Sequence, residues 1–344
     1  ICVLLVIYLY LSIKKQKKFM RRLFLVAALE TQTPFLIGLG TVVIFFILYI
    51  FIGANGWGEP ASWEQGIGEI SRWCERVAAG LFHEPINALS NIGFMVAGLL
   101  MLWILGRDQL QKKEASNFHG FNSIALLYAS VSIWLGPGSL LMHGTHTAWG
   151  AWADNLSMVM YIVLPWLINV SQLADWTRKQ FFLAYSVLIF AYAFSRALFG
   201  EGMGINLDLF GLSIVLWVIS ETLHRFWSPT LRWASGLIGF AVAAAFGITP
   251  IDMLQTPENY WWVVFFWVPA IFSKQPAKSE RTYRPWFWLG MASYFLAFII
   301  WETGKPGHPL CDPDSIFQAH AAWHLMTAFS TWCFFLFYRT EKMK

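Results

Sequence analysis

The chain has 344 residues, of which 57% are hydrophobic and only 13% are charged, and its mean hydropathy is +0.52. Soluble globular domains carry about 25% charged residues, so this composition excludes a water-soluble enzyme, a disordered binding segment and a soluble nucleic-acid module. The net charge of +4 comes from basic residues clustered between apolar runs, a pattern that sets membrane orientation rather than phosphate binding. The sequence therefore predicts an integral membrane protein.

Residues 1–33 are interpreted as an N-terminal extension that includes a basic cytoplasmic segment. Its apolar stretch 1–13 is too short to cross a hydrocarbon core about 30 Å thick, and Met20, which precedes two arginines, is a more natural start than Ile1. The uncharged run 34–54 is long enough to span the membrane and too long for the apolar part of a cleaved signal peptide. We therefore expect the first transmembrane helix there.

Nine further charge-poor runs of spanning or near-spanning length follow. They lie at 88–106, 121–142, 155–174, 180–199, 206–223, 233–251, 259–273, 285–302 and 315–338. The run 259–273 is the shortest, and it either crosses the membrane or lies in its interface. We expect an all-α transmembrane bundle of about ten helices, in which 55–84 is an outer-face segment, 85–338 is the main transmembrane domain and 339–344 is a cytoplasmic tail.

Lysine and arginine residues gather in every second connection between these runs. Of the 24 basic residues, 20 lie in such connections or near the chain ends, and the remaining four are Arg72, Arg76, Arg196 and Lys305. The positive-inside rule then predicts that both termini are cytoplasmic, provided that 259–273 crosses the membrane. The opposite face is periplasmic, extracellular or lumenal, and we favour a bacterial inner membrane over an ER-type membrane.

Polar side chains at membrane depth are costly and by default mark function. Ser139 and His143 lie one turn apart near the outer end of their helix, and Asp154 follows at the outer start of the next. His320 and His324 form an i,i+4 pair near the outer start of the last helix, so the charge map places all five side chains at one depth. Three imidazoles bind a zinc ion and leave a fourth position for water, as in catalytic zinc sites.

Other histidine assignments need to be weighed against this one. A lone pair of histidines four residues apart is more often interfacial than metal-binding, so zinc is favoured only by the convergence of that pair with His143 and Asp154. His146 is a rival ligand, but Gly144 and Thr145 before it predict a solvated loop histidine that is dispensable for zinc. Three more histidines are interpreted as loop or interface residues: His83, His224 and His308.

Four further charged residues gather at outer helix ends: Arg196, Glu201, Asp208 and Glu302. One interpretation is that they line an entrance for a lipid headgroup. The other is that they cap helix ends in the headgroup layer. The sequence leaves both interpretations open.

Three groups of residues resemble motifs of the alkaline ceramidases. They are Trp73-Cys74-Glu75 with Glu84-x-x-Asn87-x-x-Ser90-Asn91, Ser139-x-x-x-His143 followed eleven residues later by Asp154, and Gln318-x-His320-x-x-Trp323-His324. The resemblance covers residues 73–338. Alkaline ceramidases belong to a superfamily of seven-helix membrane hydrolases that also includes the adiponectin-receptor-like proteins.

The resemblance implies a zinc-dependent amidase that cleaves the N-acyl bond of ceramide, or of a related N-acyl lipid, into a sphingoid base or other amine and a fatty acid. It implies that zinc is held by His143, His320 and His324. Ser139 would stabilise the oxyanion, and Asp154 would carry the proton to the leaving amine. The partners implied are a ceramide-like lipid and the bilayer, without nucleic acid, and no protein partner can be inferred.

A disulfide between Cys74 and Cys311 is expected on topological grounds. These are the two cysteines in outward connections, whereas Cys2 lies in the N-terminal extension and Cys333 lies in the last helix. The pairing also resembles that of the ceramidase family. It requires an oxidising outer compartment.

The chain departs from the family pattern in two respects. The family's calcium site uses four positions, of which Glu75 and Glu84 match here, while Arg72 and Val77 occupy the other two. Calcium takes about six to eight oxygen ligands, so we expect at most a remnant of that site, with Arg72 supplying positive charge. The family core also has seven helices, and we expect the surplus to be an inserted helix pair within 206–273.

Two alternative functions remain open. One is an adiponectin-receptor-like receptor or scaffold in which zinc is structural, which four protein ligands on the metal would indicate. The other is a hydrolase of the same superfamily that acts on another lipid, such as a glycerolipid ester or a GPI-linked acyl chain. Ser139 and Asp154 favour an enzyme, because a structural zinc site needs neither.

Overall fold

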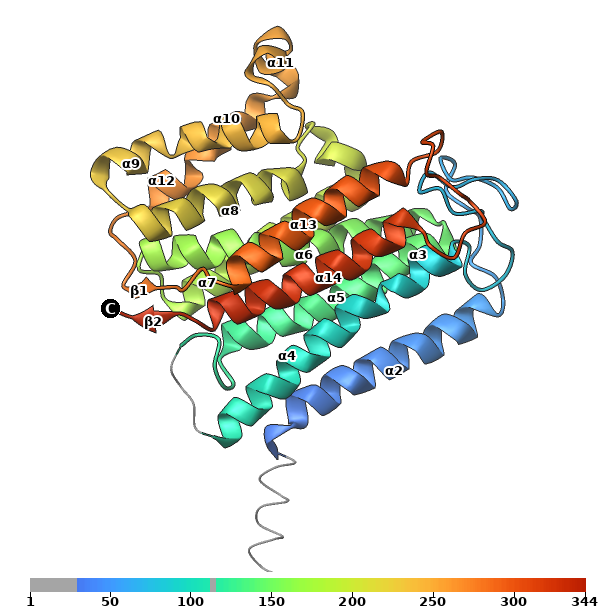
Figure 1. Cartoon of the computed structure of the whole chain (residues 1–344), viewed down its shortest axis with the longest axis horizontal. Coiled ribbons are helices and arrows are strands. Elements are labelled where there is room, and N and C mark those ends of the chain that lie inside the picture. The colour runs from blue at the N-terminus through green and yellow to red at the C-terminus, as the bar shows by residue number, and fades with distance from the viewer. Residues whose placement is uncertain (1–29, 112–115) are drawn as a thin grey trace, which may run out of the picture.

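The computed structural model describes residues 30–111 and 116–344. Helices and one pair of two-residue strands, β1 (Ser279–Glu280) and β2 (Lys342–Met343), make up the regular structure of these residues (Figure 1). The predicted all-α transmembrane bundle is therefore confirmed. Most of the expected extension 1–33, including 1–13 and Cys2, lies outside the described residues.

Six helical segments in the described part of the chain are long and apolar enough to cross a membrane. They are α2 (Thr33–Gly53), the consecutive α3 (Pro85–Ser90) and α4 (Ile92–Leu110), α5 (Ser123–Thr145), α6 (Ala148–Leu173), α7 (Arg178–Phe199) and α8 (Leu209–Phe226). Helices α13 (Trp286–Thr303) and α14 (Ala319–Tyr338) have 18 and 20 residues, or about 27–30 Å, although Trp, Tyr and His side chains lower their hydropathy. Together α4–α8, α13 and α14 match a seven-helix core that follows one extra N-terminal helix.

Between α8 and α13 the chain departs from the expected regular spans at 233–251 and 259–273. It forms short helices there: α9 (Pro229–Ala234), α10 (Gly236–Ala245), α11 (Pro250–Gln255), η2 (Pro257–Asn259), η3 (Trp261–Trp267) and α12 (Val268–Phe272). One more short helix, η1 (Glu201–Gly204), lies between α7 and α8. Gly247, at φ +86°, and Pro250 end the first stretch, and a tighter 3-10 segment makes up most of the second. Within the described residues, the two regular spans expected at 233–251 and 259–273 are therefore replaced by these shorter helices.

An inserted pair within 206–273 is nevertheless present. The Arg232 guanidinium donates from Nε to the carbonyl oxygen of Ala270 at 2.6 Å, and Trp261 Nε1 donates to the carbonyl oxygen of Ile205 at 2.8 Å. The first bond joins the start of the first stretch, α9 and α10, to the end of the second stretch, η3 and α12. The second bond joins the start of η3 to the turn before α8. The two stretches therefore run antiparallel to each other along α8 (Figure 1).

The close approach of α5 and α6 determines where the polar side chains lie. A Cβ atom added at Gly138 would lie 2.5 Å from Cβ of Ser157 and 2.9 Å from the carbonyl oxygen of Ala153. Small residues commonly permit such contacts between membrane helices. Because Ser139 follows Gly138 and Asp154 follows Ala153, this contact brings the hydroxyl and the carboxyl group together.

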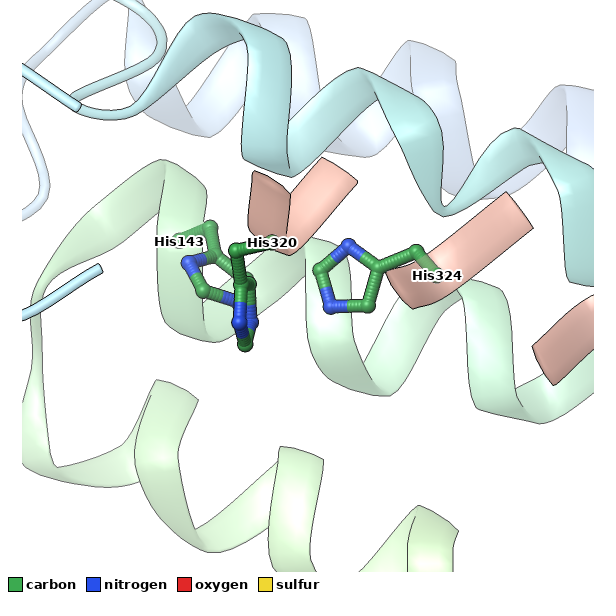
Figure 2. A group of neighbouring side chains, drawn as sticks. All are labelled: His143, His320 and His324. Atoms are coloured by element: carbon green, nitrogen blue, oxygen red, sulfur yellow. The ribbon is translucent and has the colours of Figure 1, made fainter. Parts of the chain in front are cut away.

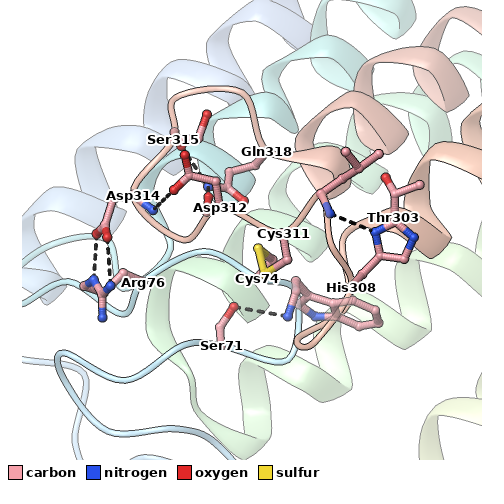
Figure 3. Close-up of a disulfide and its surroundings, with 12 residues drawn as sticks. Ser71, Cys74, Arg76, Thr303, His308, Cys311, Asp312, Asp314, Ser315 and Gln318 are labelled. Carbon is pink, nitrogen blue, oxygen red and sulfur yellow. Dashed lines mark hydrogen bonds and ion pairs between the residues drawn. A yellow bond between two sulfur atoms is a disulfide. The ribbon is translucent and has the colours of Figure 1, made fainter.

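The loops at one end of the bundle are tied together covalently. Cys74, in segment 55–84, forms a disulfide with Cys311 in the connection between α13 and α14 (Figure 3). Arg76 adds an ion pair with Asp314, with N···O distances of 2.6 and 2.7 Å. The predicted disulfide is thus present, and the C-terminus lies at the opposite end of the bundle (Figure 1).

Candidate active site

Three buried histidines converge at the end of the bundle that carries the disulfide. His143 lies in the last turn of α5, and His320 and His324 lie in the first two turns of α14. One ring nitrogen from each lies within 4.8 Å of those of the other two, and the Nε2 atoms of His143 and His320 are 3.1 Å apart. Figure 2 shows the three rings next to one another, so the residues predicted as ligands come together across 177 positions of sequence.

Hydrogen bonds at the outer ring nitrogens orient two of these histidines. Nδ1 of His143 donates to Oε2 of Glu84 at 3.1 Å. Nδ1 of His324 donates to the carbonyl oxygen of Asn87 at 3.1 Å and lies 2.8 Å from Oγ of Ser90. A carboxylate and a carbonyl only accept hydrogen bonds, so in the neutral form of both rings Nε2, on the side of the cluster, is the nitrogen with the lone pair.

The three side chains fit a zinc ion. Ligand nitrogens around tetrahedral zinc, at Zn–N distances of about 2.0–2.1 Å, lie about 3.3 Å apart, and the Nε2 atoms of His143 and His320 are 3.1 Å apart. Metal-binding histidines commonly donate their other N–H to a carboxylate or carbonyl, as His143 and His324 do. His320 is held instead by stacking on Trp73, with ring centroids 4.3 Å apart.

Ser139 and Asp154 lie beside the histidines, as the sequence predicts. Oγ of Ser139 is 3.5 Å from Nε2 of His324. The Asp154 carboxyl group, in the second turn of α6, interacts with the Ser139 hydroxyl and lies within electrostatic reach of His143. The site therefore combines three imidazoles, one hydroxyl and one carboxyl group in a largely apolar bundle.

The surroundings of His146 contradict the predicted solvated loop histidine. His146 is only 2% exposed, and its left-handed conformation, at φ 52°, ends α5. Its carbonyl oxygen accepts a hydrogen bond from the Ala61 N–H, so segment 55–84 covers it. Its Nε2 donates to Oε1 of Glu84 at 2.8 Å, which connects it to His143 through one carboxylate, although it lies outside the three-histidine group.

Glu84 is the shared acceptor at this end of α5. It lies just before α3, is buried, and also accepts a hydrogen bond from Nδ2 of Asn87 at 2.8 Å. Burial alone would raise the pKa of Glu84, but the neighbouring His143 and His146 lower it well below its ordinary value. Glu84 is therefore an ionised carboxylate that holds two imidazoles in place.

The remaining charged and histidine residues lie away from the cluster or act locally. Asp208 caps α8 by accepting hydrogen bonds from N–H groups of its first turn. Arg196 forms an ion pair with Glu201, and Glu302 forms one with Lys305. These contacts favour the helix-end interpretation over a headgroup entrance. His224 is buried in the last turn of α8 and hydrogen-bonds to Gln172 at 2.9 Å, so it is not a loop residue.

Three residues that surround the cluster carry no assigned role in the sequence analysis: Trp73, Asn87 and Ser90. Each was part of a motif, but a side chain that orients a ligand has no spacing signature of its own. Ser90 also lines a mostly apolar cavity of about 690 Å³ between α3, α13 and α14, together with Leu89, Ile300, Ala321 and Leu325.

The fold and the site together define a multi-pass membrane protein with a buried three-histidine cluster flanked by a hydroxyl and a carboxyl group. A family model described as Ceramidase matches residues 70–343. The chain belongs to the ceramidase family, as the motif resemblance predicts. No individually curated protein matches the chain. Family membership implies a hydrolase that acts on amide bonds and takes a lipid substrate.

Proposed function

We propose that this chain is an intramembrane zinc-dependent amidase that hydrolyses the N-acyl bond of ceramide or a related N-acyl lipid. The observation that carries the proposal is the buried group formed by His143, His320 and His324, with Ser139 beside it. We propose these three histidines as the zinc ligands. When bound, zinc supplies Lewis acidity, which polarises a carbonyl group and activates water at neutral pH.

The chain's own side chains provide the rest of the chemistry. Ser139 lies on the His324 side of the cluster, where its hydroxyl can donate to the carbonyl oxygen as negative charge develops on it. Asp154 holds a proton from the attacking water and transfers it to the leaving nitrogen, so the amine departs neutral. Glu84 stays ionised and keeps the His143 ring aligned.

The bundle supports a lipid substrate that approaches from within the membrane. The cavity beside Ser90 and Ala321 is mostly apolar in its lining, which suits an acyl or sphingoid chain. We propose that the termini face the cytoplasm and that segment 55–84 faces an oxidising compartment. The positive-inside pattern of the loops and the Cys74–Cys311 disulfide both support this orientation.

The test is to purify the protein in detergent, measure its metal content and profile hydrolysis across N-acyl and O-acyl lipids. We expect zinc in the protein and fatty acid released from ceramide, with little release from glycerolipid esters. Preferential cleavage of O-acyl lipids would make it a lipid esterase of the same superfamily. Zinc held by four protein ligands, without hydrolysis of any lipid, would make it a receptor or scaffold.

A further inference from the structure

The segment around Trp73 is held by hydrogen bonds from nitrogen donors. Both oxygens of the buried Glu75 carboxylate accept from backbone N–H groups, Oε1 from Ile86 at 2.7 Å and Oε2 from Asn87 at 2.8 Å. Burial raises the pKa of Glu75, and these two bonds lower it only in part. Glu75 thereby accepts hydrogen bonds from two N–H groups at the start of α3 that have no acceptor within the helix.

The Glu84 carboxylate is occupied in the same way. Its Oε1 accepts from Nε2 of His146 at 2.8 Å, and its Oε2 accepts from Nδ2 of Asn87 at 2.8 Å and Nδ1 of His143 at 3.1 Å. All the oxygens of Glu75 and Glu84 therefore face N–H groups. Each of these oxygens already accepts a hydrogen bond, which leaves it fewer lone pairs to offer a cation.

The other two positions of the family's calcium pattern supply no side-chain oxygen. Val77 is buried and apolar. Arg72 forms an ion pair with the buried Glu64 carboxylate, whose other oxygen lies 3.9 Å from Nδ1 of His146. Calcium takes about six to eight oxygen ligands, so the residues present here do not fit a calcium ion.

We propose that nitrogen donors of this chain replace the cation, with Arg72 neutralising Glu64 and His146 holding Glu84 in the position from which it orients His143. His146 is thus a positioning residue that acts through Glu84. The positioning role of His146 rests on the proposed zinc site. The misfit of these residues to calcium is independent of the zinc site.

The calcium part is tested on the purified full-length protein, without reference to zinc or to hydrolysis. The protein is equilibrated with millimolar calcium chloride or magnesium chloride, passed into salt-free buffer and analysed for bound metal, and its unfolding midpoint is measured in both salts. We expect no stoichiometric calcium and the same midpoint in calcium as in magnesium. One retained calcium per chain, or a midpoint raised by calcium alone, would overturn the proposal.

The positioning part is tested by zinc affinity, measured by competition with a chelator, in His146→Ala and His146→Gln. Both substitutions impose the same strain at φ 52°, but only glutamine keeps an N–H donor for Glu84. We expect the alanine variant to bind zinc about 10–100-fold more weakly and the glutamine variant to stay near the parent. His308→Ala, in the connection between α13 and α14, is the control. Equal zinc affinity in the two variants, whether kept or lost, would contradict the positioning role.

Discussion

Nδ1 of His143 lies 3.1 Å from the Glu84 carboxylate, although 59 positions separate the two residues in sequence. Glu84 also starts the turn into α3, whose Asn87 carbonyl accepts the N–H of His324. One short stretch therefore orients histidines from two different helices. Such outer partners fix which ring nitrogen is free to bind a metal, so the loop before α3 is part of the site as well as its cover.

The first prediction concerns zinc. His320→Ala removes one of three converging imidazoles, and we expect it to lose the zinc that the parent protein retains at about one ion per chain after dialysis. The measurement is elemental analysis of purified protein. His308→Ala is the matched control and should keep its zinc. If His320→Ala retains stoichiometric zinc, the ligand assignment is wrong.

The second prediction separates metal binding from chemistry. Asp154→Asn and Ser139→Ala leave all three histidines in place, so both variants should keep zinc. Turnover should fall by about 10²–10⁴-fold, the usual range for general acid–base catalysis. Zinc content and initial rates on the best lipid substrate are measured on the same preparations. Full activity of Asp154→Asn on every lipid that the parent hydrolyses would exclude the proton-transfer role.

The third prediction uses the contact between α5 and α6. In Gly138→Ala the new Cβ meets Ser157 and the Ala153 backbone at 2.5–2.9 Å, so the helices must separate next to Ser139 and Asp154. We expect a loss of about 1–3 kcal/mol in stability and a lower turnover number. Gly40→Ala is the control, because a Cβ there meets nothing within 4 Å. Equal behaviour of the two variants would show that the helix spacing does not position the site.

Much of this arrangement was predictable because the relevant signals are local or topological. His320 and His324 share a helix face at i,i+4, and alternating loop charge placed His143 and Asp154 at the same depth. The Cys74–Cys311 disulfide followed from the same topology and from the family resemblance. None of these inferences required knowing how the helices pack.

The features that could not be predicted from the sequence depend on tertiary burial and on residues that interrupt helices. Gly144 and Thr145 make His146 resemble a loop residue, but segment 55–84 folds over it and Glu84 supplies its partner. Hydropathy over 233–251 and 259–273 measures composition, and it does not register that Gly247 and a 3-10 segment interrupt the helices. Short helices and a buried histidine therefore appear where regular spans and a solvated side chain were expected.

The fourth prediction concerns the end of the bundle opposite the histidines. The Arg281 side chain is fully buried between the Glu221 and Glu341 carboxylates, each 2.8 Å away. Arg281→Met leaves both carboxylates without their cation, and we expect a loss of about 3–5 kcal/mol in stability.

Unfolding midpoints in detergent measure the effect of Arg281→Met. The matched control is Lys278→Met, because Lys278 pairs with Asp175 at 2.7 Å while both side chains are more than half exposed. Exposed pairs contribute little, so its midpoint should hardly change. A small effect of Arg281→Met would mean that the two carboxylates become protonated or hydrated at low cost.

The last prediction concerns the disulfide, which closes a loop of 237 positions between Cys74 and Cys311. In the chain-entropy model such a loop contributes about 5 kcal/mol, and less where the membrane already restricts the unfolded chain. Cys74→Ser should therefore lower the unfolding midpoint and loosen the segment that carries Trp73, on which His320 stacks. Cys333→Ser, which alters a free buried cysteine in α14, is the control for losing a sulfur atom. Mass spectrometry of unreduced peptides tests the bond directly, and freely alkylated Cys74 and Cys311 in protein purified without reductant would refute both the disulfide and the placement of this face in an oxidising compartment.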